Sequence, residues 1–535
     1  MNTLTAIKKR AIASVGWLES RLQLRQSIWP VMRHPIPAEV AHKKGWWYVF
    51  GSVTMTFFLL QVATGICLAM VYEPTAQSAY NSLIELNEVT PLGWLMRSIH
   101  YWSATGMVVM LIVHMTQVFL MGAFKYPREV TWLFGVGLLV LTLGLAFSGQ
   151  VLRFDSDSYW GVSVAAAAAG RVPWAGPSIV HLILGGEIIG TSTLGRFYAL
   201  HVFVLPALLV LLLVGHIYLV VKRGISEPPD PDEPVDPATY DAKYEKLLDR
   251  GVPFFPHAVY RDGIACAAAV LIVVALAVTL GPKGPLALPD PTIVHAEPRP
   301  DWYFLPLFAV AALSPASVET FLMLGMPVLG LVVLVAIPFV SGSGQRSASR
   351  RPVAVLCVTV MFVCLTLLGW YGQVSPWSPQ MDAWSSEAVP TRIVQRLSPL
   401  ELQGAVVLQN KACRNCHALD GKGGQRGPDL TDVGTRLNRD AMIRQVVQGG
   451  GNMPAYGQKL SSAETEALVA FLMAMRPAGR PPAMMPAAPA PVQGNPVQGD
   501  PVQGDPVQTD TVQTAPLEAA APTAPIDADS AKSAS

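Results

Sequence analysis

Seven long apolar segments constrain the fold of this 535-residue chain more than any other feature. A helix needs about 20 apolar residues to cross a bilayer, and in lipid its backbone groups must be satisfied within the helix. The segments cover residues 46–71, 94–121, 130–149, 197–221, 264–280, 318–340 and 353–371. The sequence therefore predicts an all-α fold whose main part is a seven-helix transmembrane bundle.

Composition supports a membrane protein, because 51% of the residues are hydrophobic and only 14% are charged. The formal net charge of +1 provides no basic excess, so we expect no nucleic-acid partner. Most of the six cysteines lie singly inside apolar runs, and these are predicted to be small core hydrophobes. They are Cys67, Cys266, Cys357 and Cys364.

The distribution of Lys and Arg predicts the topology. These residues gather before the first span, between the second and third spans, and between the sixth and seventh spans. The positive-inside rule then places the N-terminus in the cytoplasm and everything after residue 371 in the periplasm of a bacterial cytoplasmic membrane. The apolar run 301–313 is too short to span and should lie at the outer interface.

Four histidines lie inside the second and fourth predicted spans. His100 and His114 are 14 residues apart and His201 and His216 are 15 apart, which is close to four helical turns, or about 21 Å. A lone intramembrane histidine is often a packing residue, but ionisable groups in hydrocarbon are rare and need partners. The two matched pairs predict two bis-imidazole haem b groups. His100 would pair with His201 near the outer face, and His114 with His216 near the inner face.

Glycines on the flanking spans repeat the spacing. They are Gly51 and Gly65 on the first span, and Gly135 and Gly149 on the third. Because glycine lets a flat macrocycle approach the backbone, these four are candidate haem-lining positions. Arg97 and Arg128 are candidate partners of haem propionates, with snorkelling at the interface as the alternative.

The segment "CRNCH" near the C-terminus is the attachment signal for a covalent c-type haem. Cys413 and Cys416 would form thioethers to the haem, and His417 would be an axial iron ligand. Met453, in a glycine-rich stretch before a proline, is the preferred sixth ligand because a thioether raises the haem potential. Met442 is the competing candidate.

Three stretches, "RSIHYWSATG", "STLGRFYALH" and "PRPDWYFLP", resemble cytochrome b of the Rieske/cytochrome b complexes, the quinol:cytochrome c oxidoreductases. The resemblance runs from about residue 34 to 371. The 15-residue offset and the seven spans are similar to the plastoquinol-oxidising branch, in which the protein is split into two subunits. Residues 400–475 resemble a class I cytochrome c.

The resemblance implies a function. The chain would oxidise membrane quinol at the outer face. One electron would pass through the two b haems to an inner quinone site and the other through a Rieske iron–sulfur protein to the fused c haem, coupled to proton translocation in a respiratory chain. The implied partners are the Rieske protein, the quinone pool, a soluble or membrane-bound high-potential acceptor, and further subunits of a dimeric complex.

The chain departs from that family at three positions. Val49 stands where the plastoquinol branch attaches an extra haem through Cys, so we expect no covalent third membrane haem. Tyr101 follows His100 where that branch commonly has Arg. Asp301 replaces the usual Glu of the outer quinol motif and keeps its carboxylate.

Asp301 is the candidate acceptor of a quinol proton, since a carboxylate in an apolar pocket can titrate in the working range. The alternative is an interfacial acid that only caps a short helix. Tyr303 and Tyr159, with Trp160, are predicted to shape the pocket.

Two other functions stay open from the sequence. The first is a membrane anchor that passes electrons to or from a peripheral dehydrogenase. The second is a structural or sensory haem protein without turnover.

The predicted organisation has seven parts. They are a cytoplasmic N-terminal segment (1–44), a four-helix haem b domain (45–223), a cytoplasmic linker (224–257), a three-helix domain with the outer quinol loop (258–375), a linker (376–399), a cytochrome c domain (400–476) and a disordered repeat tail (477–535).

Overall fold

The computed structural model describes residues 13, 16, 17, 19–21, 23–41, 43–186, 188–291, 299–314, 316–374, 388–424, 427–450, 453–477 and 481. Within these residues, seven helical segments are long and apolar enough to cross a membrane, which confirms the predicted seven spans. The strands are only two residues long, so the fold is all-α as predicted. The tail predicted from residue 477 onward lies almost entirely outside the described residues.

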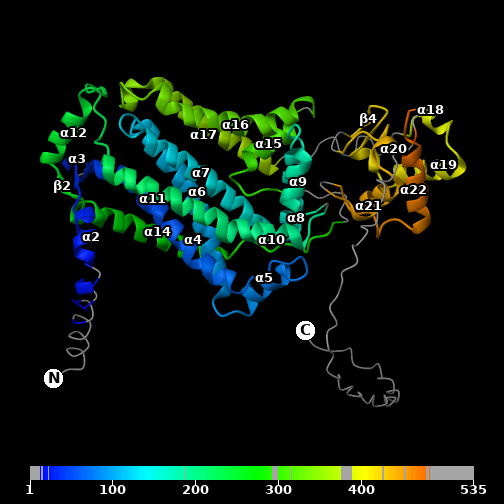
Figure 1. The fold of residues 1–535 in the computed structure, drawn as a ribbon, viewed down its shortest axis with the longest axis horizontal. Coiled ribbons are helices and arrows are strands. Elements are labelled where there is room, and N and C mark those ends of the chain that lie inside the picture. The colour runs from blue at the N-terminus through cyan, green and yellow to red at the C-terminus, as the bar shows by residue number, and fades with distance from the viewer. Residues whose placement is uncertain are drawn as a thin grey trace, which may run out of the picture. The chain divides into compact units, whose positions relative to one another are not determined.

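The spanning helices follow the apolar segments closely (Figure 1). They are α4 (Phe50–Ala69) with the turn η1 (Lys43–Tyr48) before it, α6 (Gly93–Leu120), α7 (Glu129–Val151), α10 (Thr191–Ala199) continuing through η2 (Leu200–Val204) into α11 (Leu205–Arg223), α14 (Val259–Leu280), α16 (Ala316–Val340) and α17 (Pro352–Val374).

The helices that carry the histidines each pack against one neighbour. Helix α4 lies along α6, α7 lies along α11, and α14 packs against both α4 and α6. Phe57, Met107, Leu138 and Leu209 belong to the apolar core between these helices. This packing brings the first and second spans together, and likewise the third and fourth.

Three of the lone cysteines contradict the prediction that they lie in the core. Cys67, Cys357 and Cys364 are exposed on the surface of the chain, whereas Cys266 is half-buried. All four stand on apolar helices, and such helices can present apolar side chains outward because lipid is as apolar as leucine. The prediction was wrong because it treated an apolar environment as a protein core.

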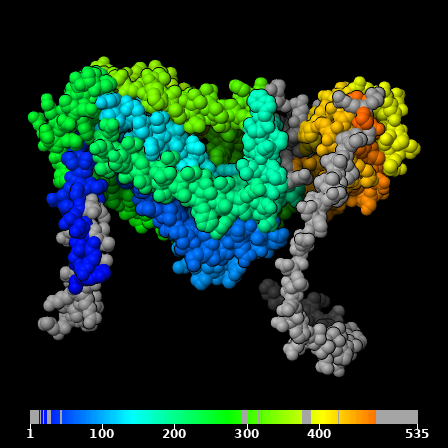
Figure 2. Space-filling model, viewed as in Figure 1, coloured from blue at the N-terminus to red at the C-terminus, as the bar shows by residue number. Residues whose placement is uncertain are grey.

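Short helices cover one end of the bundle, which we call the Asp301 end. They are α5 (Ala79–Glu88), α8 (Ser156–Gly170), α9 (Gly176–Leu184) and α15 (Leu305–Leu313). Helix α15 has nine residues, which agrees with the prediction that the run 301–313 is too short to span. A hollow is visible between the light-green helices α15 to α17 and the blue-green helices α9 and α10 (Figure 2).

Polar contacts tie loops together at the opposite end, which we call the Lys125 end. The Lys125 ammonium donates to the carbonyls of Ser341 (2.6 Å) and Ser343 (2.5 Å), and Arg346 pairs with Glu227. The segment 224–257 was predicted only as a linker, yet it contains secondary structure. The elements at this end are α2 (Leu24–Met32), α3 (Ala38–Ala41), α12 (Tyr240–Asp249), α13 (Phe254–His257) and the antiparallel pair β1 (Pro35–Ile36) and β2 (Val252–Pro253).

The C-terminal segment folds into a small helical domain around Leu408, Leu419 and Phe471. Ser398 and Ser461 begin its two main helices with capping boxes, in which each serine hydroxyl accepts from a backbone N–H three residues on. The elements are α18 (Thr391–Val394), α19 (Pro399–Asn410), η4 (Cys413–Asn415), β3 (Ala418–Leu419), β4 (Lys422–Gly423), α20 (Val433–Arg436), α21 (Arg439–Gln448) and α22 (Ser462–Ala474).

Candidate redox sites

The structure brings the predicted histidine pairs together across two helices. The rings of His100 on α6 and His201 in η2 have centroids 6.3 Å apart and planes inclined by 72°. His114 and His216, farther along α6 and α11, are electrostatic neighbours. Each pair is therefore placed so that two imidazoles can share one metal centre.

A π-helical turn explains why the two histidine offsets differ by one residue. His201 lies in η2, where the chain forms π-type hydrogen bonds before continuing as α11. A π-turn inserts one extra residue into an α-helix and is often found at functional sites. The 15-residue offset from His201 to His216 therefore spans nearly the same axial distance as the 14-residue offset from His100 to His114.

Each predicted haem-lining glycine lies against one histidine ring. The pairs, with the distance from a Cβ built on the glycine to the imidazole Cε1, are Gly51 and His114 (3.4 Å), Gly65 and His100 (3.4 Å), Gly135 and His216 (3.8 Å), and Gly149 and His201 (2.8 Å). Optimal carbon contacts are about 3.5–4.0 Å. A side chain at Gly149 would thus displace the His201 ring, while one at Gly135 would make ordinary contact.

Two side-chain hydroxyls orient the histidines nearer the Asp301 end. The Nδ1 of His100 lies 2.9 Å from Thr64 Oγ1, and the Nδ1 of His201 lies 3.0 Å from Ser148 Oγ. Both hydroxyls donate their own proton to a carbonyl of their own helix, so they accept from the imidazoles. The Nε2 atoms are left unprotonated, which is the form that binds iron.

The histidines nearer the Lys125 end have different partners. His216 Nδ1 lies 3.1 Å from the carbonyl oxygen of Thr131. The buried Nδ1 of His114 has no hydrogen-bond partner within the described part of the chain. The four imidazoles, with glycine backbone beside each, fit two bis-histidine haems, and the two sites differ in their supporting contacts.

The residue directly before each haem-lining glycine is a sequence signal for these supporting contacts. Hydroxyl side chains directly precede the glycines near the Asp301 end, whereas phenylalanines precede the other two glycines. The four dipeptides are Thr64-Gly65, Ser148-Gly149, Phe50-Gly51 and Phe134-Gly135. A hydroxyl–glycine pair repeated on two spans indicates a hydrogen-bond acceptor for an imidazole and a close approach at equivalent positions.

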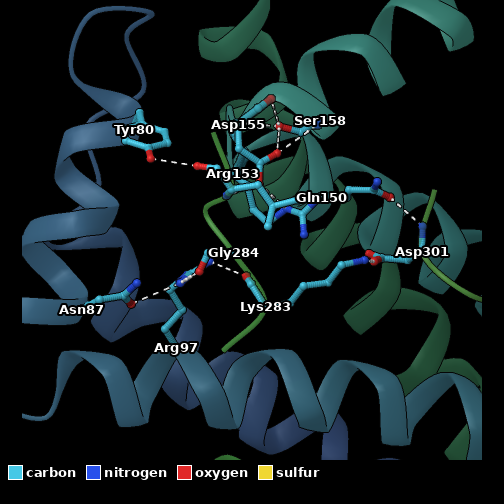
Figure 3. Close-up of polar contacts among 12 residues, drawn as sticks. Tyr80, Asn87, Arg97, Gln150, Arg153, Asp155, Ser158, Lys283, Gly284 and Asp301 are labelled. Atoms are coloured by element: carbon cyan, nitrogen blue, oxygen red, sulfur yellow. Dashed lines mark hydrogen bonds and ion pairs between the residues drawn. The ribbon is translucent and has the colours of Figure 1, made fainter. Parts of the chain in front are cut away.

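Protein groups already engage the two arginines predicted to meet propionates. Arg97 donates to the backbone carbonyls of Lys283 (2.6 Å) and Gly284 (2.5 Å) and to the side chain of Asn87 (3.1 Å; Figure 3). The buried Arg128 donates to the Gly224 carbonyl (3.0 Å) and to the hydroxyl of Tyr240 (2.7 Å). Their contact with haem remains a prediction.

Asp301 lies in a polar network at the end of the bundle named after it. Lys283 Nζ lies 2.6 Å from Asp301 Oδ1, and the Tyr303 hydroxyl donates to Oδ2 over 3.1 Å. The Asp301 N–H points to Gln150 Oε1 at 3.4 Å, and the residue is only 8% exposed. Figure 3 shows Lys283 reaching toward Asp301 from the loop after α14. The sequence does not predict this lysine, because no motif or period links the two residues.

The two tyrosines of the predicted pocket have different surroundings. Burial, strengthened by the Asp301 carboxylate, raises the pKa of Tyr303, so its hydroxyl stays a proton donor to Asp301. Burial also raises the pKa of Tyr159 on α8. The ring contacts of Tyr159 among the described residues are with Phe154 and Trp160. Tyr159 is therefore not brought into the hydrogen-bond network of Asp301.

In the C-terminal domain the "CRNCH" segment begins with the turn η4, and a backbone carbonyl contacts the ring of its histidine. His417 Nδ1 lies 2.8 Å from the Pro428 carbonyl, which leaves Nε2 free for iron, and burial lowers its pKa. A Cβ on Gly427 would collide with the His417 ring. Cys413 begins η4 and Cys416 caps its end, so both thiols stand on the turn directly before His417.

The two candidate sixth ligands occupy different environments. Met442 is 2% exposed and belongs to the apolar core of the domain. Met453 is half-buried at the edge of that core, and its sulfur accepts from Gln445 Nε2 at 3.6 Å. A side chain at the edge of the core can reach a bound haem. A side chain inside the core could reach one only if the core opened. This difference favours Met453 as the sixth ligand.

Comparisons with known proteins find related families along the chain. Residues 35–224 match the family described as Cytochrome b/b6/petB, and residues 289–387 match Cytochrome b(C-terminal)/b6/petD. Residues 401–472 match Cytochrome C oxidase, cbb3-type, subunit III.

Individual relatives cover the membrane part. Cytochrome b6 of Synechococcus sp. (strain RCC307) is 40% identical over 212 residues, which are 40% of this chain and 95% of that protein. Cytochrome b6 of Tupiella akineta is 41% identical, with 97% of its length covered. A hyperthermophilic respiratory Complex III chain has a similar structure, with a TM-score of 0.57 and 26% identity over 68% of this chain and 92% of that one. The chain belongs to the cytochrome b/b6 family and carries in addition a C-terminal cytochrome c domain.

Proposed function

We propose that the chain is the cytochrome b/c subunit of a proton-translocating quinol:cytochrome c oxidoreductase. The observation that carries this proposal is the pairing of His100 with His201, 6.3 Å apart, at the same end of the bundle as the buried acid Asp301. A membrane anchor for a dehydrogenase would not need that acid, and a structural haem protein would need neither the acid nor a second histidine pair.

The proposed cofactors are two non-covalent b haems and one covalent c haem. The haems, when bound, supply one-electron carriers at fixed positions. The first b haem would be held by His100 and His201 and the second by His114 and His216. The c haem would be held by Cys413, Cys416, His417 and Met453.

The proposed orientation puts the Asp301 end outside and the Lys125 end in the cytoplasm of a bacterial cytoplasmic membrane. Lys125, Arg128 and Arg346 lie at one end, as the positive-inside rule expects for the cytoplasmic side. The proposed partners are a Rieske iron–sulfur protein, the membrane quinone pool, a high-potential electron acceptor and further subunits of a dimeric complex. One electron from quinol would leave through the Rieske protein toward the c haem, and the other would cross to an inner quinone site.

Quinol oxidation releases two protons, and Asp301 is placed to accept one. Lys283 Nζ lies 2.6 Å from one oxygen of this carboxylate and fixes its position. Tyr303 fixes the second carboxylate oxygen by donating to it. The Lys283 side chain is 35% exposed, so the pair connects a buried acid to the aqueous surface. The carboxylate could therefore take a proton from quinol and release it on the outer side.

The Asp301→Asn variant tests this role. The amide is nearly isosteric, so the haems and fold should be retained while quinol oxidation slows by about 10² to 10⁴ fold, the usual contribution of a general base. The measurement is the rate of haem b reduction by quinol with the inner quinone site inhibited. Asp301→Glu keeps the carboxylate and should remain active. An Asn variant as fast as the wild type at every pH would show that Asp301 is only a structural acid.

A further inference from the structure

Arg153 is a buried cation, and two of its donor atoms have no hydrogen-bond partner among the described residues. It lies two residues after α7 and is 9% exposed. Its Nε and Nη2 atoms make no hydrogen bond within the described part of the chain. The carboxylate of Asp155 is 3.6 Å from Nε, which is longer than a hydrogen bond. Buried guanidinium donors without acceptors are costly, so an acceptor is expected to reach them.

Asp155 is occupied by other donors. One of its oxygens accepts from the backbone N–H (3.0 Å) and hydroxyl (2.8 Å) of Ser158, which caps the start of α8. The other oxygen accepts from the backbone N–H of Leu286 at 3.0 Å. Asp155 is fully buried. Asp155 thus connects the start of α8 to the loop after α14 (Figure 3). Its oxygens are occupied, and the Nε and Nη2 atoms of Arg153 remain without an acceptor among the described residues.

The position of Arg153 relates it to the first histidine pair. Gly149 lies against the His201 ring, and Arg153 follows four residues later, about one helical turn toward the Asp301 end. Arg97 stands one turn from His100 on the facing helix and is an electrostatic neighbour of Arg153. Arg97 already donates to three protein groups. Of the two neighbouring arginines, Arg153 is therefore the one whose guanidinium still has donors available for a ligand.

We propose that Arg153 binds an oxyanion at the outer end of the first haem pocket, and that this oxyanion is a propionate carboxylate of the haem held by His100 and His201. A guanidinium presents a planar pair of donors that matches a carboxylate. The inference rests on the proposed outer haem. A quinol oxygen is the other source of similar chemistry, because the charge of Arg153 also acts on the hydroxyl of Tyr303.

The test is a redox titration of the b haems in the purified complex, without added quinol, for the wild type and Arg153→Gln. Removing a cation next to a haem disfavours the reduced form, so the reduction equilibrium constant of the outer haem should fall about tenfold, which is about 59 mV for one electron. The inner haem is an internal control and should not change. Arg171→Gln removes a charge from the loop after α8, where Arg171 bonds Thr320, and should leave both haems unchanged.

The outcomes separate the possible ligands. An unchanged outer haem potential with weaker quinol binding would overturn the propionate assignment in favour of a quinol oxygen. No change in either property would overturn a ligand role for Arg153. If the Gln variant does not assemble, Arg153→Lys keeps the charge without the planar donor pair and should retain most of the potential. A wild-type complex with no outer haem b would instead refute the proposed function on which the inference rests.

Discussion

At the scale of single residues, the two proposed b haem sites have the same ligands but different supports. Thr64 and Ser148 orient the outer imidazoles through hydroxyl groups, whereas His216 depends on a backbone carbonyl. Hydrogen bonds to the second ring nitrogen raise the basicity of a ligating histidine. The outer site is therefore open to adjustment by single side-chain changes, and the inner site is less so.

Alanine substitutions at two glycines provide a matched test of the histidine sites. Gly149→Ala would place a methyl carbon 2.8 Å from His201 Cε1, whereas Gly144→Ala on the same helix would place one 3.7 Å from Leu205 Cδ1 and away from the histidines. The first change should displace the His201 ring and remove the outer haem, about half of the haem b content, because carbons this close repel. The second should leave both haems bound. Optical spectra of the two purified complexes measure this, and equal haem b content in both would contradict the assignment.

Replacement of Lys283 tests its control over Asp301. Lys283→Met removes the ammonium that lies 2.6 Å from Asp301 Oδ1, so one carboxylate oxygen loses its side-chain partner and is held less firmly. Quinol oxidation at a fixed pH should therefore slow, by less than in the Asp301→Asn variant. Lys283→Arg keeps a cation at this position and should preserve the wild-type rate. If Lys283→Met slows the reaction equally in the Asp301→Asn background, the effect does not arise at Asp301.

At the scale of elements, the apolar segments predicted all seven spans, because a helix in lipid must be apolar over its whole length. The spacing of the four histidines predicted which of them meet at one end of the bundle. The π-turn η2 was not predicted, since it leaves no mark in composition. The helices α12 and α13 and the strand β2, all within residues 224–257, were also missed, because their few apolar residues are scattered among prolines and acids.

The small C-terminal domain offers a choice between two methionines that mutation can settle. Met453→Leu should remove the sixth ligand and lower the potential of haem c by more than about 59 mV, a tenfold change, because a thioether ligand raises it. Met442→Leu replaces a core side chain with one of similar volume, which usually costs less than about 1.5 kcal/mol. It should leave the potential unchanged. A titration in which only the Met442 variant shifts would reverse the assignment.

At the scale of the whole molecule, one chain combines a cytochrome b part with a C-terminal cytochrome c domain. The cytochrome b6 relatives match 40% of the chain, and the c-type domain lies beyond them at residues 401–472. The sequence motifs indicated both parts. The Lys283–Asp301 contact and the unused donors of Arg153 were not predictable, because they depend on loops that meet only in the folded bundle.

The most direct test of the central claim is a rapid-mixing experiment in which quinol is added to the oxidised complex, with its Rieske protein present and the inner quinone site inhibited. The spectra of the b and c haems are then followed together. If the chain divides the two electrons of quinol, b and c haems should be reduced in step, with one electron in each branch per quinol oxidised. Reduction of the c haem while both b haems stay oxidised would contradict the account.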